Sequence, residues 1–510
     1  MTHALESTRS IAVIGSGAMG SGIAQIAAAA GHPVMLFDVR PGAAANAITE
    51  IHKTFRRLVE KGRMSASAME AANARLTAAA DLNGLAGAAL VVEAIVESLE
   101  VKRKLFVDLE GVVREDCIFA TNTSSISITS IGAVLRLPQR LLGMHFFNPA
   151  PLMALVEVVS GLATDPAVAR TIYDTAAAWG KSPVHAKSTP GFIVNRVARP
   201  FYAEGLRLLG EQASDAATID AVMREAGGFR MGPFELMDLI GHDVNYSVTR
   251  SVFDAFYNDP RFTPSLIQQE LVNAGFLGRK SGRGFYRYGE GTTLPPAQTE
   301  PPAPPPERVV VWPAGPTTQG VATRIGKASI QFSMEKAPHP DGRLLTVGDA
   351  AVYLTDGRSA TQRGCDNDQS GTVLVDLAFD YTKATRIALT RGDRCSTTAY
   401  QSAVGLFQAA GYAVSRLDDV PGMAVMRTVA MLANEAADAV NQGVCDALAA
   451  DAAMQKGVNY PRGPLAWADA IGLQHVMTVL DNLAHTYGED RYRASPLLRR
   501  KVWSGGNFHA

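Results

Sequence analysis

The sequence predicts an α/β domain with a mainly parallel sheet, an all-helical domain behind it, and then a smaller α/β domain followed by a second copy of the helical one. Three observations lead to this prediction. Short β-branched runs alternate with helical stretches up to about Val159, a pattern that is typical of βαβ units. The texture becomes helical after Thr189-Pro190-Gly191. The helical part then recurs 231 positions later.

Length and charge limit the class of protein. At roughly 100 to 200 residues per domain, 510 residues predict three or four domains, and 47% hydrophobic residues are enough to build their cores. The chain has 48 Lys and Arg against 49 Asp and Glu. This near-neutral balance argues against a partner nucleic acid, because such affinity comes mostly from neutralising phosphates.

The cysteines and the N-terminal segment indicate in which cellular compartment the protein is expected. Four cysteines lie far apart without a CxxC pair, which predicts neither a disulfide framework nor a structural metal site: Cys117, Cys365, Cys395 and Cys445. Met1–Ser10 lacks the apolar stretch of a signal peptide, and no run approaches 18 apolar residues. We therefore expect a soluble, cytoplasmic protein with no metal and no membrane partner.

The front part of the chain contains the expected parallel sheet. Its strands are predicted at five short apolar runs: Ile11–Ile14, Val34–Phe37, Leu90–Ala94, Ile118–Ala120 and Leu142–His145. One long helical stretch is predicted over Phe192–Leu209, because its apolar residues recur at near-helical spacing.

A proline-rich segment divides the chain. Between Pro295 and Pro306 seven of twelve positions are proline. Proline fixes φ and donates no hydrogen bond, so this segment is interpreted as a semi-rigid, extended spacer. A plain linker is the favoured reading, and a proline-rich ligand for a partner domain is the alternative.

The repeat defines the back part. At a shift of 231 positions, Pro190-Gly191 falls on Pro421-Gly422 and Gly232-Pro233 on Gly463-Pro464, and the register holds to Gly275 and Gly506. The stretch before the second copy has strand-like runs but no GxGxxG, so we interpret it as a reduced, cofactor-free α/β domain. The predicted boundaries are 1–189, 190–290, 291–307 for the linker, 308–418 and 419–510.

A glycine motif points to a dinucleotide. Gly15, Gly17 and Gly20 follow a predicted strand and open a predicted helix, and the next strand ends in Asp38, 18 residues past Gly20. In a Rossmann-type unit such glycines let the backbone approach a pyrophosphate, and the acidic residue binds the adenine ribose. A simple glycine-rich turn with a capping Asp is the alternative. Arg40 could meet a 2′-phosphate, but its neighbour Asp38 would repel one, which favours NAD over NADP.

Ordered motifs over residues 9–288 resemble the 3-hydroxyacyl-CoA dehydrogenases: Gly15–Gly20, Val91–Glu97, Thr121–Ser125, His145–Pro149, Pro190–Arg196, Gly232–Glu235 and Gly282–Tyr286. The duplicated helical domain behind a reduced α/β domain is similar to the long bacterial form. Several of those act as 3-hydroxyadipyl-CoA dehydrogenases in phenylacetate breakdown, and others as 3-hydroxybutyryl-CoA dehydrogenases of short-chain fatty acid metabolism.

The catalytic residues implied by this resemblance are His145, Glu157, Ser124 and Asn195. Oxidation of a secondary alcohol needs a base for the hydroxyl proton, and His145 ends a strand at the sheet edge where ligands bind. Glu157 would orient the imidazole, while Ser124 and Asn195 would hold the substrate oxygen. The run around Ser124 alone would indicate a helix N-cap. The counterpart of Asn195 is Met426, so we expect no active site in the second copy.

The same resemblance implies the binding residues. For NAD they are Gly15, Gly17, Ala18, Met19, Gly20, Asp38, Glu97, Lys102, Asn148 and Lys280, and for the acyl-CoA substrate they are Thr54, Lys61 and Ser124. Thr54 stands where the family has serine, which leaves its contact open. Taken alone, the charges over Arg56–Arg63 would be an ordinary solvated helix face.

The expected reaction is the NAD-dependent, reversible oxidation of an (S)-3-hydroxyacyl-CoA to the 3-oxoacyl-CoA. A non-catalytic NAD or acyl-CoA sensor is the alternative from another class, and the joint presence of the four catalytic residues argues against it. The acyl group stays open. Short members of the family dimerise through the helical domain, so the second copy could pack on the first as an internal pseudo-dimer, or the chain could form a homodimer.

Overall fold

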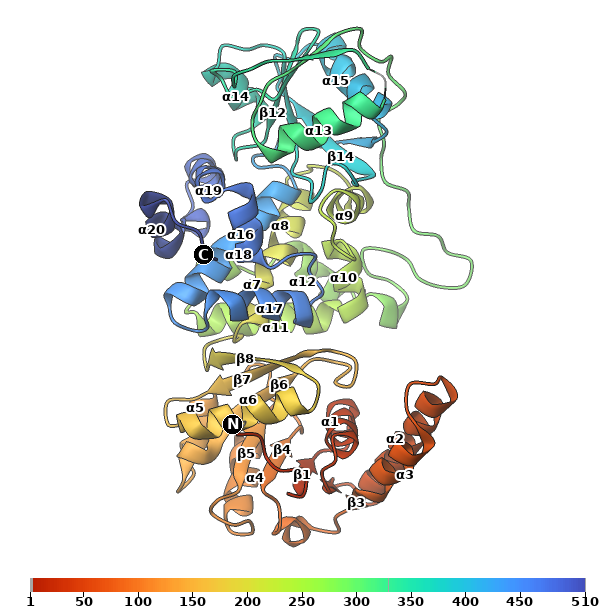
Figure 1. The fold of residues 1–510 in the computed structure, drawn as a ribbon, viewed down its shortest axis with the longest axis vertical. Helices are drawn as coiled ribbons and strands as arrows, with labels where there is room; N and C mark the ends of the chain where they lie inside the picture. Colours follow the sequence, from red (N-terminus) through yellow and green to blue (C-terminus); the bar gives the residue numbers. More distant parts are fainter. Residues whose placement is uncertain (1–2, 329, 510) are drawn as a thin grey trace. The chain divides into compact units, whose positions relative to one another are not determined.

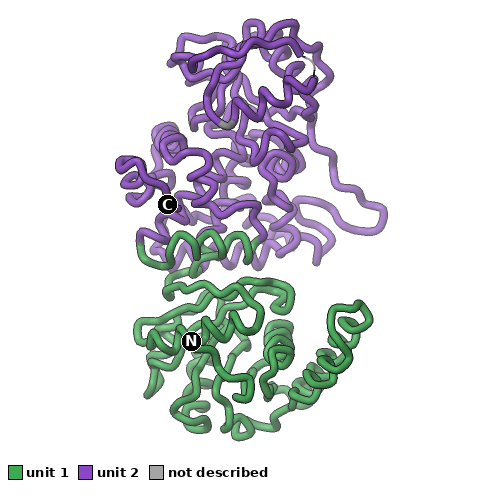
Figure 2. The backbone as a smooth tube through the Cα atoms, viewed as in Figure 1, with its two compact units in different colours: residues 1–196, 442–458 green, residues 197–441, 459–510 purple. Residues whose placement is uncertain are grey.

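The protein, described here by a computed structural model over residues 3–328 and 330–509, packs into two compact units (Figure 2). The first unit comprises Met1–Arg196 together with Gln442–Val458, and the second comprises Val197–Asn441 together with Asn459–Ala510. Within the described ranges, no helix is both long and apolar enough to cross a membrane. Each unit is built on one β-sheet.

The sheet of the first unit has eight strands in the order β3-β2-β1-β4-β5-β6-β7-β8 (Figure 1). Strand β7 runs antiparallel to β6, and β8 runs parallel to β7. The strand bounds are β1 Ile11–Ile14, β2 Val34–Phe37, β3 Leu76–Ala78, β4 Leu90–Glu93, β5 Ile118–Thr121, β6 Leu141–Phe146, β7 Leu155–Ser160 and β8 Ser182–Lys187. The parallel α/β prediction is confirmed, and its five strands are found.

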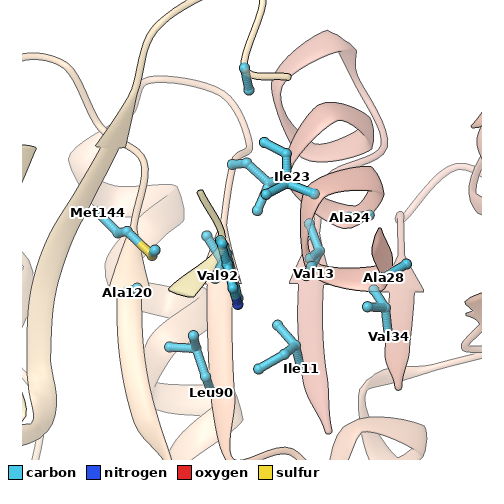
Figure 3. Close-up of a cluster of buried hydrophobic side chains, with 14 of the residues drawn as sticks. Ile11, Val13, Ile23, Ala24, Ala28, Val34, Leu90, Val92, Ala120 and Met144 are labelled. Atoms are coloured by element: carbon cyan, nitrogen blue, oxygen red, sulfur yellow. The ribbon is translucent and has the colours of Figure 1, made fainter. Parts of the chain in front are cut away.

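Helices cover this sheet and form its core. Ile23 of the first helix lies near Val13 of β1, in a buried cluster that also includes Ile11 and Val92 (Figure 3). The helix bounds are α1 Ala18–Ala29, α2 Ala43–Glu60, α3 Ala66–Ala74, α4 Leu99–Glu110, α5 Ile128–Gly132, α6 Pro166–Ala178, α7 Val194–Val197 and, from the back of the chain, α17 Ala447–Gly457. The order β1-α1-β2 is that of a dinucleotide-binding fold.

The second unit carries a smaller sheet, in the order β10-β9-β11-β12-β13-β14-β15. Its strands are β9 Val309–Val311, β10 Phe332–Met334, β11 Leu345–Val347, β12 Ala350–Leu354, β13 Thr372–Val375, β14 Arg386–Arg391 and β15 Ala413–Arg416. Its helices are α13 Pro316–Lys327, α14 Ala360–Asp366 and α15 Thr397–Ala409. This is the reduced α/β domain that the sequence predicted.

The helical copies make up the rest of the second unit. The first copy has α8 Arg199–Gly210, α9 Ala216–Glu225, α10 Pro233–Ile240, α11 His242–Ala255 and α12 Leu266–Asn273. The second has α16 Val425–Asn441, α18 Pro464–Ile471, α19 Leu473–Tyr487 and α20 Pro496–Ser504, with α17 lying in the first unit. The duplication of the helical domain is therefore confirmed.

The single long helix predicted over Phe192–Leu209 is interrupted. The structure places α7 before Ala198 and α8 after it, with Pro200 in the first turn of α8. Proline has no N–H to bond back into the preceding turn and is accepted only near a helix start. In the second copy the equivalent position is Met431, and α16 runs without a break.

The repeat extends further toward the N-terminus than the sequence comparison found. The bounds of β14 and α15 lie 231 residues after those of β7 and α6, and β13 begins 231 residues after β6. In this register Asp376 is the counterpart of His145 and Ala388 is that of Glu157. The pairing of β12 with β13 is shifted by one further residue, which makes Asp356 the counterpart of Ser124. The reduced domain thus has none of the predicted residues His145, Glu157 and Ser124 at the equivalent positions. In the second helical copy, Met426 stands in place of the amide-bearing Asn195.

Each sheet is covered by a helix from the opposite helical copy. In the first unit, α17 of the second copy packs on β7 and β8. In the second unit, α9 of the first copy packs on β14. Because α17 and α9 are counterparts, the two copies exchange equivalent helices.

The proline-rich segment is docked on the second sheet. The backbone N–H of Glu300 donates to the carbonyl of Val414 on β15 at 2.7 Å. Gln408 of α15 donates to the carbonyls of Glu300 and Pro301 at 3.1 and 2.9 Å. The extended spacer is therefore held along the edge of its own domain.

A buried carboxylate in the second unit caps the helix that follows the reduced domain. Oδ2 of Asp376 accepts the backbone N–H groups of Ala424 and Val425 at 2.9 and 2.7 Å, and Oδ1 accepts that of Met426 at 3.0 Å. Burial outweighs these donors and raises the pKa of Asp376 to about 6. The group therefore binds a proton in the folded chain at a pH where the unfolded chain has lost it.

This shift predicts a pH dependence of stability. The folded-state pKa of Asp376 is raised above the unfolded value, so its proton stabilises the fold at about pH 4, and that contribution is lost as pH rises through about 6. Asp376→Asn has no proton to lose, so its stability should not show this decrease with pH. The Tm of wild type minus the Tm of the variant should therefore become smaller between about pH 4.5 and 7.5. Thermal unfolding across this range measures it. The exposed Asp393→Asn serves as control, and a difference in Tm that does not change with pH would contradict the assignment.

Candidate active site

Two adjacent strands bring a histidine and a glutamate together. His145 of β6 lies directly opposite Glu157 of β7 in the antiparallel register. Directly opposed side chains share one face of a sheet. His145 Nδ1 lies 2.6 Å from Glu157 Oε2, and both side chains are buried. The structure thus joins the first two residues of the predicted catalytic set.

The second oxygen of Glu157 binds the start of a helix. Oε1 accepts the backbone N–H groups of Ile193 and Val194, each at 3.0 Å. Phe192 has a φ of 49°, the left-handed region that non-glycine residues seldom adopt, and this turn aims the two N–H groups at the carboxylate. The positive end of the helix favours a negative charge on Glu157.

Two aromatic rings lie against the imidazole of His145. The ring of Phe147 lies 4.5 Å from that of His145, and Phe192 meets it edge-on at 5.8 Å. Because Nδ1 is engaged by Glu157, Nε2 is the nitrogen that can exchange a proton with a bound molecule.

Ser124 and Asn195 lie 71 residues apart in the sequence and meet in the fold. Asn195 Nδ2 donates to the backbone carbonyl of Ser124 at 3.4 Å, and both residues are partly buried. Ser124 follows β5, whose neighbour in the sheet is β6 with His145 at its end. The structure therefore brings two hydroxyl- or amide-bearing groups to the sheet edge that carries the imidazole.

Glu97 organises the polar loop around Ser124. Its Oε1 accepts the Thr123 hydroxyl at 2.6 Å and the backbone N–H of Ser124 at 3.1 Å. Burial would raise the pKa of Glu97, but the Thr123 hydroxyl and the charge of Lys102 outweigh it and keep the pKa below its usual range. Glu97 is thus a carboxylate that holds the loop in place.

Lys102 is buried in an ion pair that the sequence reasoning missed. Its Nζ lies 2.6 Å from Glu93 Oε1 and 3.3 Å from Glu97 Oε2. Glu93 also accepts the Thr121 hydroxyl at 2.6 Å. The sequence did contain a signal for this pair, because the charged Glu93 is the last residue of the otherwise apolar strand that begins at Leu90.

The glycine loop has the geometry of a phosphate cradle. Gly15 has a φ of 97°, and a Cβ there would overlap the carbonyl of Ala94. A Cβ on Gly20 would overlap the carbonyl of Gly15, whereas one on Gly17 would meet nothing within 4 Å. Gly15 and Gly20 therefore allow tight packing, while Gly17 leaves open space at the start of α1, whose N–H groups suit a pyrophosphate. These residues fit the predicted NAD.

Asp38 lies at the end of β2, where the ribose-binding carboxylate is expected. It accepts the Ser16 backbone N–H at 2.9 Å and the Ser16 hydroxyl at 2.6 Å. The Arg40 side chain pairs with it at 3.0 Å, and this pairing keeps the pKa of Asp38 well below its usual range. Asp38 is therefore ionised and can accept hydrogen bonds from ribose hydroxyls.

The other predicted binding residues are placed as follows. Thr54 lies on α2 with its hydroxyl bonded to the backbone of that helix, and Lys61 is exposed at the end of α2. Asn148 is exposed in the loop after β6. In the second unit, Lys280 donates to Asp243 at 2.7 Å. The contacts of these residues with cofactor or substrate remain predictions.

A residue of the second copy supports the first helix of the site. Arg196 directly follows Asn195, is 2% exposed, and donates to Gln442 Oε1 at 2.8 Å. The equivalent pair in the second unit is Arg427 with Glu211, at 2.9 Å. Sequence reasoning missed this contact, because a repeat register does not show which copies touch.

Family comparisons agree with this arrangement. The model of the 3-hydroxyacyl-CoA dehydrogenase NAD-binding domain matches residues 10–189, and that of the C-terminal domain matches twice, at 191–288 and 422–507. The model described as the 3-hydroxybutyryl-CoA dehydrogenase reduced Rossmann-fold domain matches residues 352–421. The two C-terminal matches independently confirm the duplication.

Known proteins resemble the whole chain or a little more than half of it. A 3-hydroxyadipyl-CoA dehydrogenase of Escherichia coli K12 is 43% identical over 97% of each chain. A probable 3-hydroxybutyryl-CoA dehydrogenase of Bacillus subtilis is 39% identical, covering 56% of this chain and 99% of its own. A crystal structure of 3-hydroxybutyryl-CoA dehydrogenase from E. coli K12 matches with a TM-score of 0.89 and 42% identity over 98% of this chain and 100% of that one. The chain belongs to the 3-hydroxyacyl-CoA dehydrogenase family and is an NAD-dependent oxidoreductase that acts on acyl-CoA substrates.

Proposed function

We propose that His145 is the general base that removes the hydroxyl proton of a 3-hydroxyacyl-CoA. The observation that carries this assignment is the link from His145 through Glu157 to the backbone N–H groups of Ile193 and Val194. It fixes the imidazole with Nδ1 on a carboxylate, so that Nε2 exchanges the proton. When bound, NAD supplies the acceptor for the hydride leaving C3.

Glu157 and the polar groups complete the proposed machinery. Glu157 stabilises the imidazolium that forms when His145 takes the proton, and its own charge is supported by the start of α7. Ser124 and Asn195 hold the substrate oxygen while it changes from hydroxyl to carbonyl, which their contact with one another supports. In the reverse direction the same imidazolium returns the proton.

Replacing the base tests this mechanism. His145→Gln should lower kcat by about 10² to 10⁴, the usual worth of general acid–base catalysis, and should leave NADH affinity unchanged. The readouts are NADH oxidation with acetoacetyl-CoA and titration of NADH fluorescence. His185→Gln, at an exposed histidine of the same unit, is the matched control. Turnover near the wild-type rate in His145→Gln would exclude it as the base.

We further propose 3-hydroxyadipyl-CoA as the preferred substrate. The support is the E. coli protein of that name, which is 43% identical along nearly the whole length of both chains. The name 3-hydroxybutyryl-CoA dehydrogenase on the similar crystal structure makes the four-carbon substrate the alternative.

Competing substrates distinguish these two acyl groups. Recognition of a distal carboxylate by a charged donor is worth about 1.5 to 3 kcal/mol, so kcat/KM should be at least about tenfold higher for 3-hydroxyadipyl-CoA than for 3-hydroxybutyryl-CoA. Initial rates of NAD reduction on both thioesters measure the ratio. A ratio of one or below would favour the shorter substrate.

We also propose that the second half takes the place of a partner subunit and braces the catalytic half. Three observations support this internal pseudo-dimer. Helices α17 and α9 are exchanged between the copies, and α8 packs against α16 in the second unit. The paired contacts Arg196–Gln442 and Arg427–Glu211 obey the same repeat register. Gln442 is then a positioning residue, acting through Arg196 on the neighbouring Asn195.

Equivalent substitutions in the two halves test the brace. Gln442→Ala removes an acceptor of buried Arg196 and should lower kcat about tenfold with little change in the KM for NADH, because Asn195 is displaced. Glu211→Ala removes the equivalent acceptor of Arg427 and should lower Tm without lowering kcat. Gln442→Glu, which copies the residue of the other half, should keep activity. Equal effects of the two alanine variants on kcat would refute a positioning role.

A further inference from the structure

The reduced α/β domain retains a cavity of about 750 Å³. All of its lining residues belong to the second unit, and they come from α13, the end of β12, the loop after β13, and the region of α18. Those that carry the argument are Phe379, Asp380, Lys383, Arg462 and Trp467.

The cavity lies where an α/β domain of this type binds ligands. Its loop over 377–383 is the counterpart of 146–152, the segment that follows the His145 strand, and α18 is the counterpart of α10. Helix α13 follows the first strand of its sheet, as α1 does. Open α/β sheets bind their ligands in the crevice at the carboxyl ends of the strands.

The chemistry of the parent site is gone from this cleft. Asp376, the counterpart of His145, is turned inward onto the backbone of the following helix. Ala388 stands for Glu157, and the turn between β9 and α13 is Trp312-Pro-Ala-Gly315 in place of a glycine-rich loop. The cleft therefore lacks the groups for binding a pyrophosphate at the helix start and for proton transfer.

The cleft has instead gained aromatic rings and cations. Phe379 stands for Asn148, Arg462 for Met231, Lys383 for Leu152 and Trp467 for Leu236. The rings of Phe379 and Trp467 lie 5.3 Å apart, and the Arg462 guanidinium lies 5.0 Å above the Phe379 ring. Random substitution in a site without function would not be expected to place the guanidinium of Arg462 over the ring of Phe379.

The charges of the cleft do not balance. Lys383 pairs with Asp380 at 3.2 Å. Among residues 3–328 and 330–509, no carboxylate lies within ion-pair distance of the partly buried Arg462. A cation that is partly withdrawn from water gains most from an anionic partner. The cleft thus offers one uncompensated positive charge beside apolar rings.

We propose that this cleft is a second ligand site that binds an organic phosphate with an apolar part, the chemistry shared by coenzyme A thioesters and adenine nucleotides. Arg462, aided by Lys383, binds the phosphate, and Phe379 and Trp467 contact the apolar part. Cavities of roughly 300 to 1,000 Å³ are usual for such ligands. The proposal does not depend on the catalytic roles assigned above, because none of these residues belongs to the active half.

Calorimetry on the full-length protein tests the proposal. The probes are acetyl-CoA, ATP and inorganic phosphate, each titrated into wild type, Arg462→Gln and the double variant Arg462→Gln/Lys383→Gln. We expect, besides any binding by the catalytic half, a second binding event in wild type that weakens at least tenfold in Arg462→Gln and disappears in the double variant, with NADH oxidation unchanged. Arg394→Gln, at an arginine of the same domain outside the cavity, is the control. Quenching of tryptophan fluorescence that is lost in Trp467→Phe should accompany the binding.

The probes separate the two sources of the phosphate. Binding of acetyl-CoA alone identifies a thioester ligand, and binding of both acetyl-CoA and ATP identifies the nucleotide part as the recognised group; either result supports the site. The proposal is overturned if no probe shows an event that depends on Arg462, or if inorganic phosphate binds as tightly as the organic probes. Far-ultraviolet circular dichroism of each variant verifies that the fold is intact.

Discussion

The carboxylate of Glu157 is the contact on which the catalytic half depends. One oxygen holds the imidazole of His145, and the other accepts two N–H groups where the chain enters α7. The sheet and the helix that bears Asn195 are therefore joined through a single side chain. Because Asn195 follows immediately after the capped residues, the same carboxylate sets the positions of both the imidazole of His145 and the amide of Asn195.

In the second half, a carboxylate still caps the equivalent helix start, although the counterparts of His145 and Glu157 are different residues. There, Ala388 has lost the carboxylate on β14, and Asp376 supplies one from the adjacent position after β13. It accepts the N–H groups of Ala424 and Val425, the counterparts of Ile193 and Val194. A helix start pointing into a buried edge needs an acceptor whether or not chemistry happens there. The imidazole was dispensable and the cap was not.

Periodicity and motif spacing were sufficient to predict five strands of the first sheet and the glycine loop, because each depends on residues close in sequence. The residues His145, Glu157, Ser124 and Asn195 came from the resemblance to a family, and their catalytic roles stay predictions. Other features depend on long-range packing. Glu93 appears as one polar residue in an apolar strand, and only the fold shows that it pairs with Lys102. The break before Pro200 could have been read from the proline itself. The exchange of α9 and α17 could not have been predicted from the sequence. The two helical copies share one sequence pattern, and this pattern does not show which copy packs on which sheet.

The two halves of a duplicated chain can change independently, whereas the two subunits of a symmetric homodimer cannot. In a twofold dimer every substitution appears on both sides of the interface at once, so a residue and its image cannot differ. In this chain they do: Arg427 meets a charged Glu211, whereas Arg196 meets a neutral Gln442. Joining the halves thus allowed the two interfaces to diverge separately, one keeping an ion pair and the other an uncharged amide next to the helix that bears Asn195.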